Sequence, residues 1–320
     1  TIIGLYITTV ISSIGFHYYE ACNQSLTLQW LDKKKAPEIM GRIYGVGAFA
    51  QLFTLGLILL VYLAGVGSFS WEALARSNKL VDDISSYQTL YIGAGLSTVL
   101  LAVAALMIFP HFNEKIVQRR QIVLRKRYWL YYSLTFIAGA RRQIFLVFAS
   151  FLMVEKFGYS LAQITALFLL NAAFNMWLAP MVGKIISRVG ERVALVAEYI
   201  GLIGVFIAYA FVESGTVAAG LYVIDHMFFA FAIAIKTYFQ KIGAPEDMAS
   251  TASVAFTINH IAAVAVPAAF GLIWLVNPSA VFLAGAGMAA LSLILATNVP
   301  RHPEEGHEVV FGHRGSKAVA

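Results

Sequence analysis

Two short stretches resemble each other at a distance of 208 residues: KKKAPEIMGRIYGV at 33–46 and QKIGAPEDMASTASV at 240–254. Each stretch joins two long apolar segments, so the repeated residues occupy equivalent places in the chain. A repeat in equivalent places predicts a protein built from two related halves. The matched pairs are Lys33 and Lys241, Ala36 and Ala244, Pro37 and Pro245, Glu38 and Glu246, Met40 and Met248, and Val46 and Val254.

The segments on either side of these stretches are long enough and apolar enough to cross a bilayer. The chain has 320 residues, of which 59% are hydrophobic and only 12% are charged, whereas a soluble domain carries about 25% charged residues. The composition excludes an ordinary soluble domain and predicts an all-α polytopic membrane protein. We expect nine transmembrane helices, at about 2–28, 40–64, 88–110, 128–153, 161–182, 191–212, 216–239, 250–275 and 278–298.

The basic residues give these helices an orientation. Those between 33–42, 115–127, 184–192, 236–241 and 301–317 fall on one side of the membrane, and the opposite side holds only Arg76, Lys79 and Lys156. By the positive-inside rule the first side, with the C-terminus, is cytoplasmic. Short basic loops of this kind favour a lipid bilayer as partner over nucleic acid, despite the net charge of +6. Cys22 is the only cysteine, so an internal disulfide and a cysteine-based metal cluster are excluded.

The repeat also divides the chain into domains. An offset of 208 pairs the first three helices with the last three, and leaves the middle three without partners. We therefore expect a twelve-helix protein in which three helices precede residue 1. The expected parts are the rest of an N-terminal half at 1–110, a basic cytoplasmic linker at 111–127, a six-helix C-terminal half at 128–300 and a cytoplasmic tail at 301–320.

This organisation resembles the major facilitator superfamily (MFS) of secondary transporters. The stretch GKIISRVGER at 183–192 is similar to the family's loop signature, which is a glycine followed by Asp-Arg-x-Gly-Arg-Arg. Ser187 replaces the usual aspartate and Glu191 an arginine; the matching residues are Gly183, Arg188, Gly190 and Arg192. The resemblance covers nearly the whole chain and implies helices 4–12 of an MFS-like bundle. It also implies that this loop helps to gate the cytoplasmic side, with Glu198 as a candidate for the same charge cluster.

Several polar side chains lie within the predicted helices, where an ionisable group costs about 2.5–3.5 kcal/mol even on a lenient scale. In the first helix they follow one face at helical spacing, so that face must contact protein or water. Its members are Tyr6, Thr9, Ser13, His17, Glu20, Gln24 and Thr27. The resemblance adds that helices 1, 4, 7 and 10 line the family's central cavity. Glu20, the Arg141–Arg142 pair and Asp225 lie on the helices equivalent to 4, 7 and 10.

These residues form the candidate site. Because Arg141 and Arg142 point about 100° apart on a helix, we expect one to face the cavity and the other to pair with Glu20 or Asp225. Lys236 shares the helical face of Asp225, but it is close enough to the surface to snorkel. Asn171 and Asn175 suit interhelical hydrogen bonds as well as ligand contacts. The candidates for substrate binding or coupling are Glu20, Arg141, Arg142, Asp225, His17, Tyr18, Gln24, Asn175 and His226.

The function that these features favour is secondary active transport of a small polar, anionic solute by alternating access, as a symporter or antiporter. An arginine would hold the solute, while Glu20 or Asp225 with a neighbouring histidine would carry a coupling proton. The alternative is an MFS-like membrane scaffold or assembly factor without transport activity, in which internal ion pairs consume the whole polar stripe. A metal or haem site at His17 and Glu20 lacks a second His/Glu pair, and no nucleotide-binding or catalytic motif is present. We therefore expect no metal, no cofactor and no enzymatic activity, in a monomer of the bacterial inner membrane.

Overall fold

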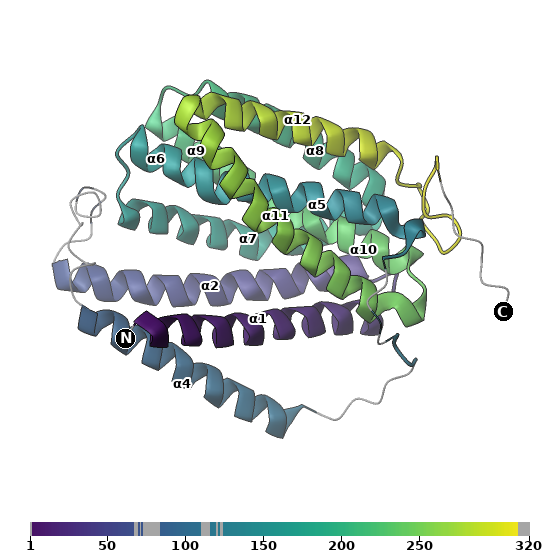
Figure 1. The fold of residues 1–320 in the computed structure, drawn as a ribbon, viewed down its shortest axis with the longest axis horizontal. Helices are drawn as coiled ribbons and strands as arrows, with labels where there is room; N and C mark the ends of the chain where they lie inside the picture. The colour runs from purple at the N-terminus through teal and green to yellow at the C-terminus, as the bar shows by residue number, and fades with distance from the viewer. Residues whose placement is uncertain are drawn as a thin grey trace.

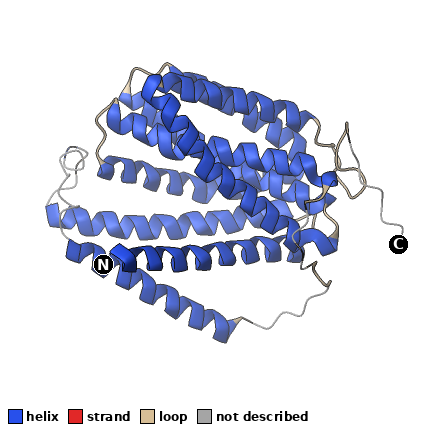
Figure 2. Ribbon diagram, viewed as in Figure 1, coloured by secondary structure: helices blue, strands red, loops and turns tan. Residues whose placement is uncertain are grey.

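The computed structural model describes residues 2–66, 70, 72, 84–109, 116–119, 121 and 124–312. Within these ranges the regular structure is helical, apart from one isolated β-bridge between Glu304 and His307 (Figure 2). The predicted linker at 111–127 and tail at 301–320 are therefore described only in part. Six basic residues used for the orientation lie outside the described residues: Arg76, Lys79, Lys115, Arg120, Arg314 and Lys317.

The helices follow the predicted spans closely. In the first part of the chain they are α1 (Ile2–Trp30), α2 (Ala36–Val66) and α4 (Ile84–Ile108). The second part contains η2 (Lys126–Tyr128), α5 (Trp129–Gln143), η3 (Ile144–Ala149), α6 (Ser150–Glu155), α7 (Leu161–Val189), α8 (Glu191–Ala210), α9 (Gly215–Phe228), η4 (Phe229–Phe231), α10 (Ala232–Ile242), η5 (Pro245–Asp247), α11 (Met248–Val276) and α12 (Pro278–Thr297).

The lengths and apolar surfaces of these helices confirm the all-α polytopic fold. Within the described residues, seven segments are long and apolar enough to cross a membrane. These segments comprise most of α4 and the helices of the second part of the chain. Helices α1 and α2 have 29 and 31 residues, which at about 1.5 Å per residue also exceeds a hydrocarbon core of about 30 Å.

Two of the predicted spans are not continuous α-helices. The span 128–153 contains the π-helical segment η3 directly after Gln143, and the span 216–239 contains the 3₁₀ segment η4 at Phe229–Phe231. Neither segment contains a proline, so the sequence offers no simple signal for the breaks. Irregular turns within a helix often occur at functional sites, and both of these lie beside the cavity described below.

The second part of the chain forms a bundle with a continuous apolar core, and α1 and α2 pack onto it. Within the bundle α8 lies along α12 and α5 along α11; α2 lies along α7, and α1 contacts α11 (Figure 1). Helix α4 is peripheral, since none of its residues between Tyr91 and Ile108 is buried. The core therefore belongs to α5–α12, and the division into 1–110 and 128–300 remains a prediction.

The close approach of α2 and α7 depends on glycine. A Cβ atom at Gly183 would collide with the carbonyl oxygen of Pro37, and one at Gly41 would lie 2.5 Å from the carbonyl oxygen of Ala179. Small residues at such crossings let two helix backbones come together, as is common in membrane proteins. The first and second parts of the chain therefore touch where α2 begins and α7 ends.

Candidate functional site

A cavity of about 220 Å³ lies between α1 and α2 on one side and α5, α8, α9, α10 and α11 on the other. Its charged lining residues come from both parts of the chain. Its lining includes Glu20, Gln24, Tyr44, Tyr131, Thr135, Arg141, Arg142, Glu198, Asp225, Phe228, Phe229, Lys236, Phe256 and Asn259. Five of the nine predicted substrate or coupling residues therefore share this cavity: Glu20, Gln24, Arg141, Arg142 and Asp225.

The buried member of the arginine pair is Arg141. Its side chain is 4% exposed, and its Nη2 lies 3.7 Å from Oε1 of Glu198, which is also buried. The guanidinium is stacked over the ring of Tyr199, with 4.6 Å between Cζ and the ring centre. Glu20 and Asp225 were the predicted partners, and Glu198 was assigned to the loop cluster. The rotation of α8 instead turns Glu198 toward α5, so the charge of Arg141 is compensated inside the bundle.

Its neighbour Arg142 has a different environment. The side chain is exposed and lines the cavity, with Cζ 5.3 Å from the centre of the Phe229 ring. No carboxylate among the described residues lies within ion-pair distance of it. Aromatic rings attract a guanidinium through their negative faces. Arg142 is thus held in position by an aromatic ring while its hydrogen-bond donors remain available in the cavity.

Asp225 is fully buried, yet its carboxylate lacks hydrogen bonds. Neither oxygen accepts one from the described residues. The nearest basic nitrogen is Nδ1 of His226, 3.7 Å from Oδ2, and that nitrogen is 2.9 Å from the carbonyl oxygen of Tyr222. An isolated buried carboxylate is costly unless it is paired, protonated or bound to a ligand. The carboxylate of Asp225 would therefore be stabilised by a bound cation or by a proton.

The other four predicted residues lie outside the cavity wall. Tyr18 is 74% exposed, and His17 packs against His260 with ring centres 4.4 Å apart. The amide of Asn175 donates to the carbonyl oxygen of His226, which favours the predicted alternative of an interhelical hydrogen bond. His226 itself is buried against the aromatic rings of Phe168, Tyr222 and Phe229.

The sequence analysis did not include Lys236 among the candidate site residues. Snorkelling to the surface was favoured, but the side chain lines the cavity, with Nζ 5.2 Å from the centre of the Tyr44 ring. The signal was present in the sequence, because Lys236 is on the helical face of Asp225. The aromatic partner of Lys236, Tyr44, is on α2. The spacing of residues within α10 cannot predict a contact with a residue of another helix.

The predicted gating loop connects α7 to α8. Gly190 has a φ of +83°, a conformation that favours glycine, and Gly183 forms the close contact with α2. Arg188 is exposed and Arg192 is half-buried. The strongest ion pair of the loop instead uses Glu191, whose Oε1 lies 2.6 Å from Nζ of Lys241. The departure of Glu191 from the family signature therefore creates a link to α10.

The loop contacts lie at one end of the bundle, which we call the basic end: residues 31–36, 116–119, 121, 124–128, 183–192, 240–248 and 298–312. Lys33 donates to the carbonyl oxygen of Lys241 at 3.3 Å, so the two repeated stretches touch each other. Gln240 donates to the carbonyl oxygens of Leu28 and Leu31. These bonds fasten the end of α1 to the end of α10.

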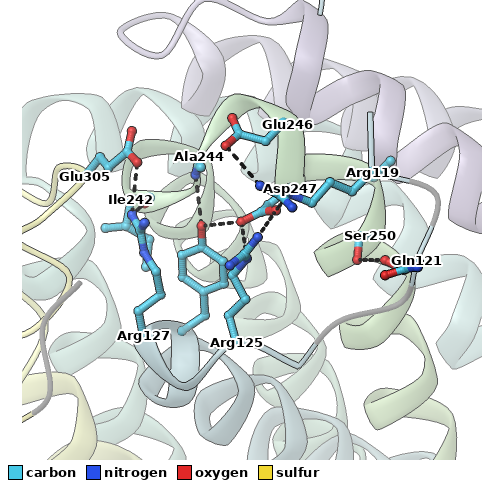
Figure 3. A network of polar contacts seen from close by, with 12 residues as sticks. Arg119, Gln121, Arg125, Arg127, Ile242, Ala244, Glu246, Asp247, Ser250 and Glu305 are labelled. Atoms are coloured by element: carbon cyan, nitrogen blue, oxygen red, sulfur yellow. Dashed lines mark hydrogen bonds and ion pairs between the residues drawn. The ribbon is translucent and has the colours of Figure 1, made fainter. Parts of the chain in front are cut away.

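Asp247 is the centre of a second network at the basic end (Figure 3). Its buried carboxylate lies 2.9 Å from Nε of Arg119 and 2.5 Å from Nε of Arg125, and the Tyr128 hydroxyl donates to it at 3.3 Å. The hydrogen bond to Asp247 raises the pKa of Arg125 above its ordinary value. Arginines that the sequence analysis used only for orientation thus tie the linker to α11.

The tail joins the same end. Arg127 lies 2.8 Å from the buried carboxylate of Glu308 and 3.3 Å from that of Glu305, and Tyr238 donates to the carbonyl oxygen of Glu308. Residues 298–312 therefore pack against the linker and α10.

Metal ligands are not grouped in the part of the chain that the structure describes. No cluster of three or more His, Cys, Asp or Glu side chains there is arranged to hold a metal ion.

Residues 1–267 match the family model of the Major Facilitator Superfamily. No curated protein matches the sequence. The match covers most of the chain and includes the cavity, the repeated stretches and the gating loop. The helices and this match together identify the chain as an integral, multi-pass membrane protein that belongs to the Major Facilitator Superfamily of secondary transporters.

Proposed function

We propose that the protein moves a small anionic solute across the membrane by alternating access, coupled to protons. The observation that carries this proposal is the difference between the two adjacent arginines. Arg141 is buried beside Glu198, whereas Arg142 faces the cavity and has no carboxylate partner among the residues that the structure describes. A guanidinium stays charged and offers paired donors that match carboxylates and phosphates. Arg142 is therefore the anchor for the anionic group of the solute.

Asp225 is the better supported of the two candidate proton carriers. It is fully buried and accepts no hydrogen bond from the described residues, while Glu20 is only half-buried. Burial favours the neutral form of a carboxyl group. A proton on Asp225 would be released when water or a cation gains access to it, which links protonation to the opening of the cavity.

The contacts between the two parts of the chain suit a reversible motion. They include the glycine-mediated crossing of α2 and α7, the packing of α1 on α11 and a few polar bonds at the basic end, such as that from Lys33 to Lys241. Interfaces of this kind separate without exposing a large apolar core. We propose that this end is cytoplasmic, in a bacterial inner membrane, and that the protein works as a monomer.

The scaffold alternative requires that internal ion pairs consume the polar groups. Arg142 and Asp225 argue against it, because within the described residues neither has a well-formed ion pair. A scaffold would gain nothing from keeping such groups in a cavity, since unpaired ionisable groups in a membrane are costly.

Transport in proteoliposomes tests the proposal. Uptake of a panel of labelled small carboxylates would be measured with an imposed proton gradient. We expect Arg142→Gln to reduce uptake by about 10- to 100-fold, because a hydrogen bond to a charged group contributes about 1.5–3 kcal/mol. The matched control Arg301→Gln, at an exposed position of the basic end, should stay within about twofold. Asp225→Asn should abolish accumulation driven by the proton gradient but retain solute exchange without it.

Two outcomes would each contradict one part of the proposal. Full uptake by the Arg142→Gln variant would exclude this arginine as the anion anchor. Gradient-driven accumulation by the Asp225→Asn variant would exclude Asp225 as the proton carrier.

A further inference from the structure

Lys236 is a second cation in the cavity that no other side chain neutralises. It lies on α10, lines the cavity, and has no carboxylate within ion-pair distance among the described residues. Its Nζ instead sits 5.2 Å from the centre of the Tyr44 ring. A lysine near a helix end usually extends toward water, so its position over a ring of α2 calls for an explanation.

Arg142 and Lys236 have similar environments in the cavity. Arg142 lies over Phe229 and Lys236 lies over Tyr44, so an aromatic ring accompanies each cation. Such a ring stabilises a cation while leaving its hydrogen-bond donors free. Both cations therefore keep the capacity to bind an anionic group.

Lys236 is on α10, and the ring beside Arg142 belongs to η4 directly before it, although Arg142 itself is on α5. Phe229, Ala232 and Lys236 all line the cavity, at intervals of three and four residues, so they share one face. Seven residues at about 1.5–2 Å each separate Phe229 from Lys236 by about 10–14 Å along the axis. Lys236 and the ring over which Arg142 lies are therefore at different depths of the cavity, so that the two cations can contact different groups of one solute.

The remaining charges of the cavity favour an anionic solute. Glu198 compensates Arg141, and Asp225 is the proposed proton site. Glu20 is then the one other acidic side chain among the described lining residues, against the two cations Arg142 and Lys236. Protonation of Asp225 therefore leaves a positive cavity.

We infer that Lys236 is a specificity-determining residue and that the solute carries two anionic groups, as a short dicarboxylate does. One group would bind Arg142 and the other Lys236. This inference rests on the proposed function, because it assumes that Arg142 anchors an anion. It adds the second contact and the chemical class of the solute.

A pair of ligands that differ by a single charge tests the inference. Glutarate and its monomethyl ester have the same carbon chain between their two carbonyl groups, but only glutarate carries two charges. Thermal stabilisation of the purified protein by each compound would give a midpoint concentration. We expect the midpoint for glutarate to be at least tenfold lower than that for the ester.

Variants then assign the second charge to Lys236. Lys236→Gln should raise the midpoint for glutarate at least tenfold and change that for the ester by less than twofold. Lys184→Gln, at an exposed lysine outside the cavity, should change neither. Tyr44→Leu removes the ring that accompanies Lys236, so it should weaken the binding of glutarate but not that of the ester.

Several results would overturn the inference. Equal midpoints for glutarate and its ester in the wild type would mean that one anionic group is enough, and absence of stabilisation by glutarate would exclude this class of solute. If Lys236→Gln lowers the melting temperature but preserves the preference for glutarate, Lys236 only joins α10 to α2. In each case a loss of uptake in Arg142→Gln would still support the proposed function, so the two failures are distinguishable.

Discussion

The polar residues of α1 and those of α5, α8 and α9 are of the same types, but their surroundings differ. Arg141, Glu198 and Asp225 are 3%, 6% and 0% exposed, and lie inside one bundle. On α1, Glu20 is half-buried and Tyr18 is 74% exposed. A buried charge must be compensated by its immediate neighbours, whereas a group beside a cavity can exchange partners. The Arg141–Glu198 pair therefore supports the fold, whereas Glu20 of α1 lies beside the cavity without an ion pair among the described residues.

The largest expected effect comes from breaking the buried pair. Glu198→Ala would leave Arg141 as an uncompensated buried charge, which costs about 3–5 kcal/mol in comparable pairs. The free energy of unfolding, measured by denaturant titration in mixed micelles, should fall by that amount.

A double variant separates charge compensation from packing. Arg141→Met with Glu198→Leu removes both charges and retains similar volumes, so most of the lost stability should return. If Glu198→Ala were as stable as the wild type, Arg141 would have another partner and the comparison with α1 would lose its basis.

A smaller effect is expected where α2 crosses α7, at the contact between the two parts of the chain. Gly183→Ala places a Cβ atom against the carbonyl oxygen of Pro37, and overpacking of this kind costs about 1–3 kcal/mol. The matched variant is Gly47→Ala on α2, where nothing lies within 4 Å of the new atom. That variant should gain about 0.5–1 kcal/mol, since alanine favours a helix more than glycine does. Equal unfolding free energies for the two variants would show that the crossing is loose.

Much of the fold could be predicted from the sequence because the membrane restricts the choices. Apolar length located the helices, and the repeated Ala-Pro-Glu stretches at 36–38 and 244–246 located two equivalent turns. These stretches also contact each other, through Lys33 and Lys241. The breaks at η3 and η4 could not be predicted, since no proline or glycine pattern marks them.

For the site, the sequence could predict only which helix each residue is on and how deep in the membrane it lies. Spacing identified Glu20, Arg142 and Asp225 as groups in mid-membrane, and all of them line the cavity. Which arginine is buried depends on the rotation of α8, which brings Glu198 to Arg141. Such contacts join residues that are far apart in the sequence, so periodicity within one helix cannot supply them.

The smallest effect on stability is expected for Glu20 on α1. It is half-buried beside the cavity and has no ion pair in the part of the chain that the structure describes. Glu20→Gln should therefore change the free energy of unfolding by no more than about 0.5 kcal/mol, as is usual away from buried networks. Transport should nevertheless change, because the substitution removes one negative charge from the cavity that we propose to bind an anion. A loss of several kcal/mol in this variant would place Glu20 with Glu198 among the groups that support the fold, and would remove the distinction between α1 and the bundle.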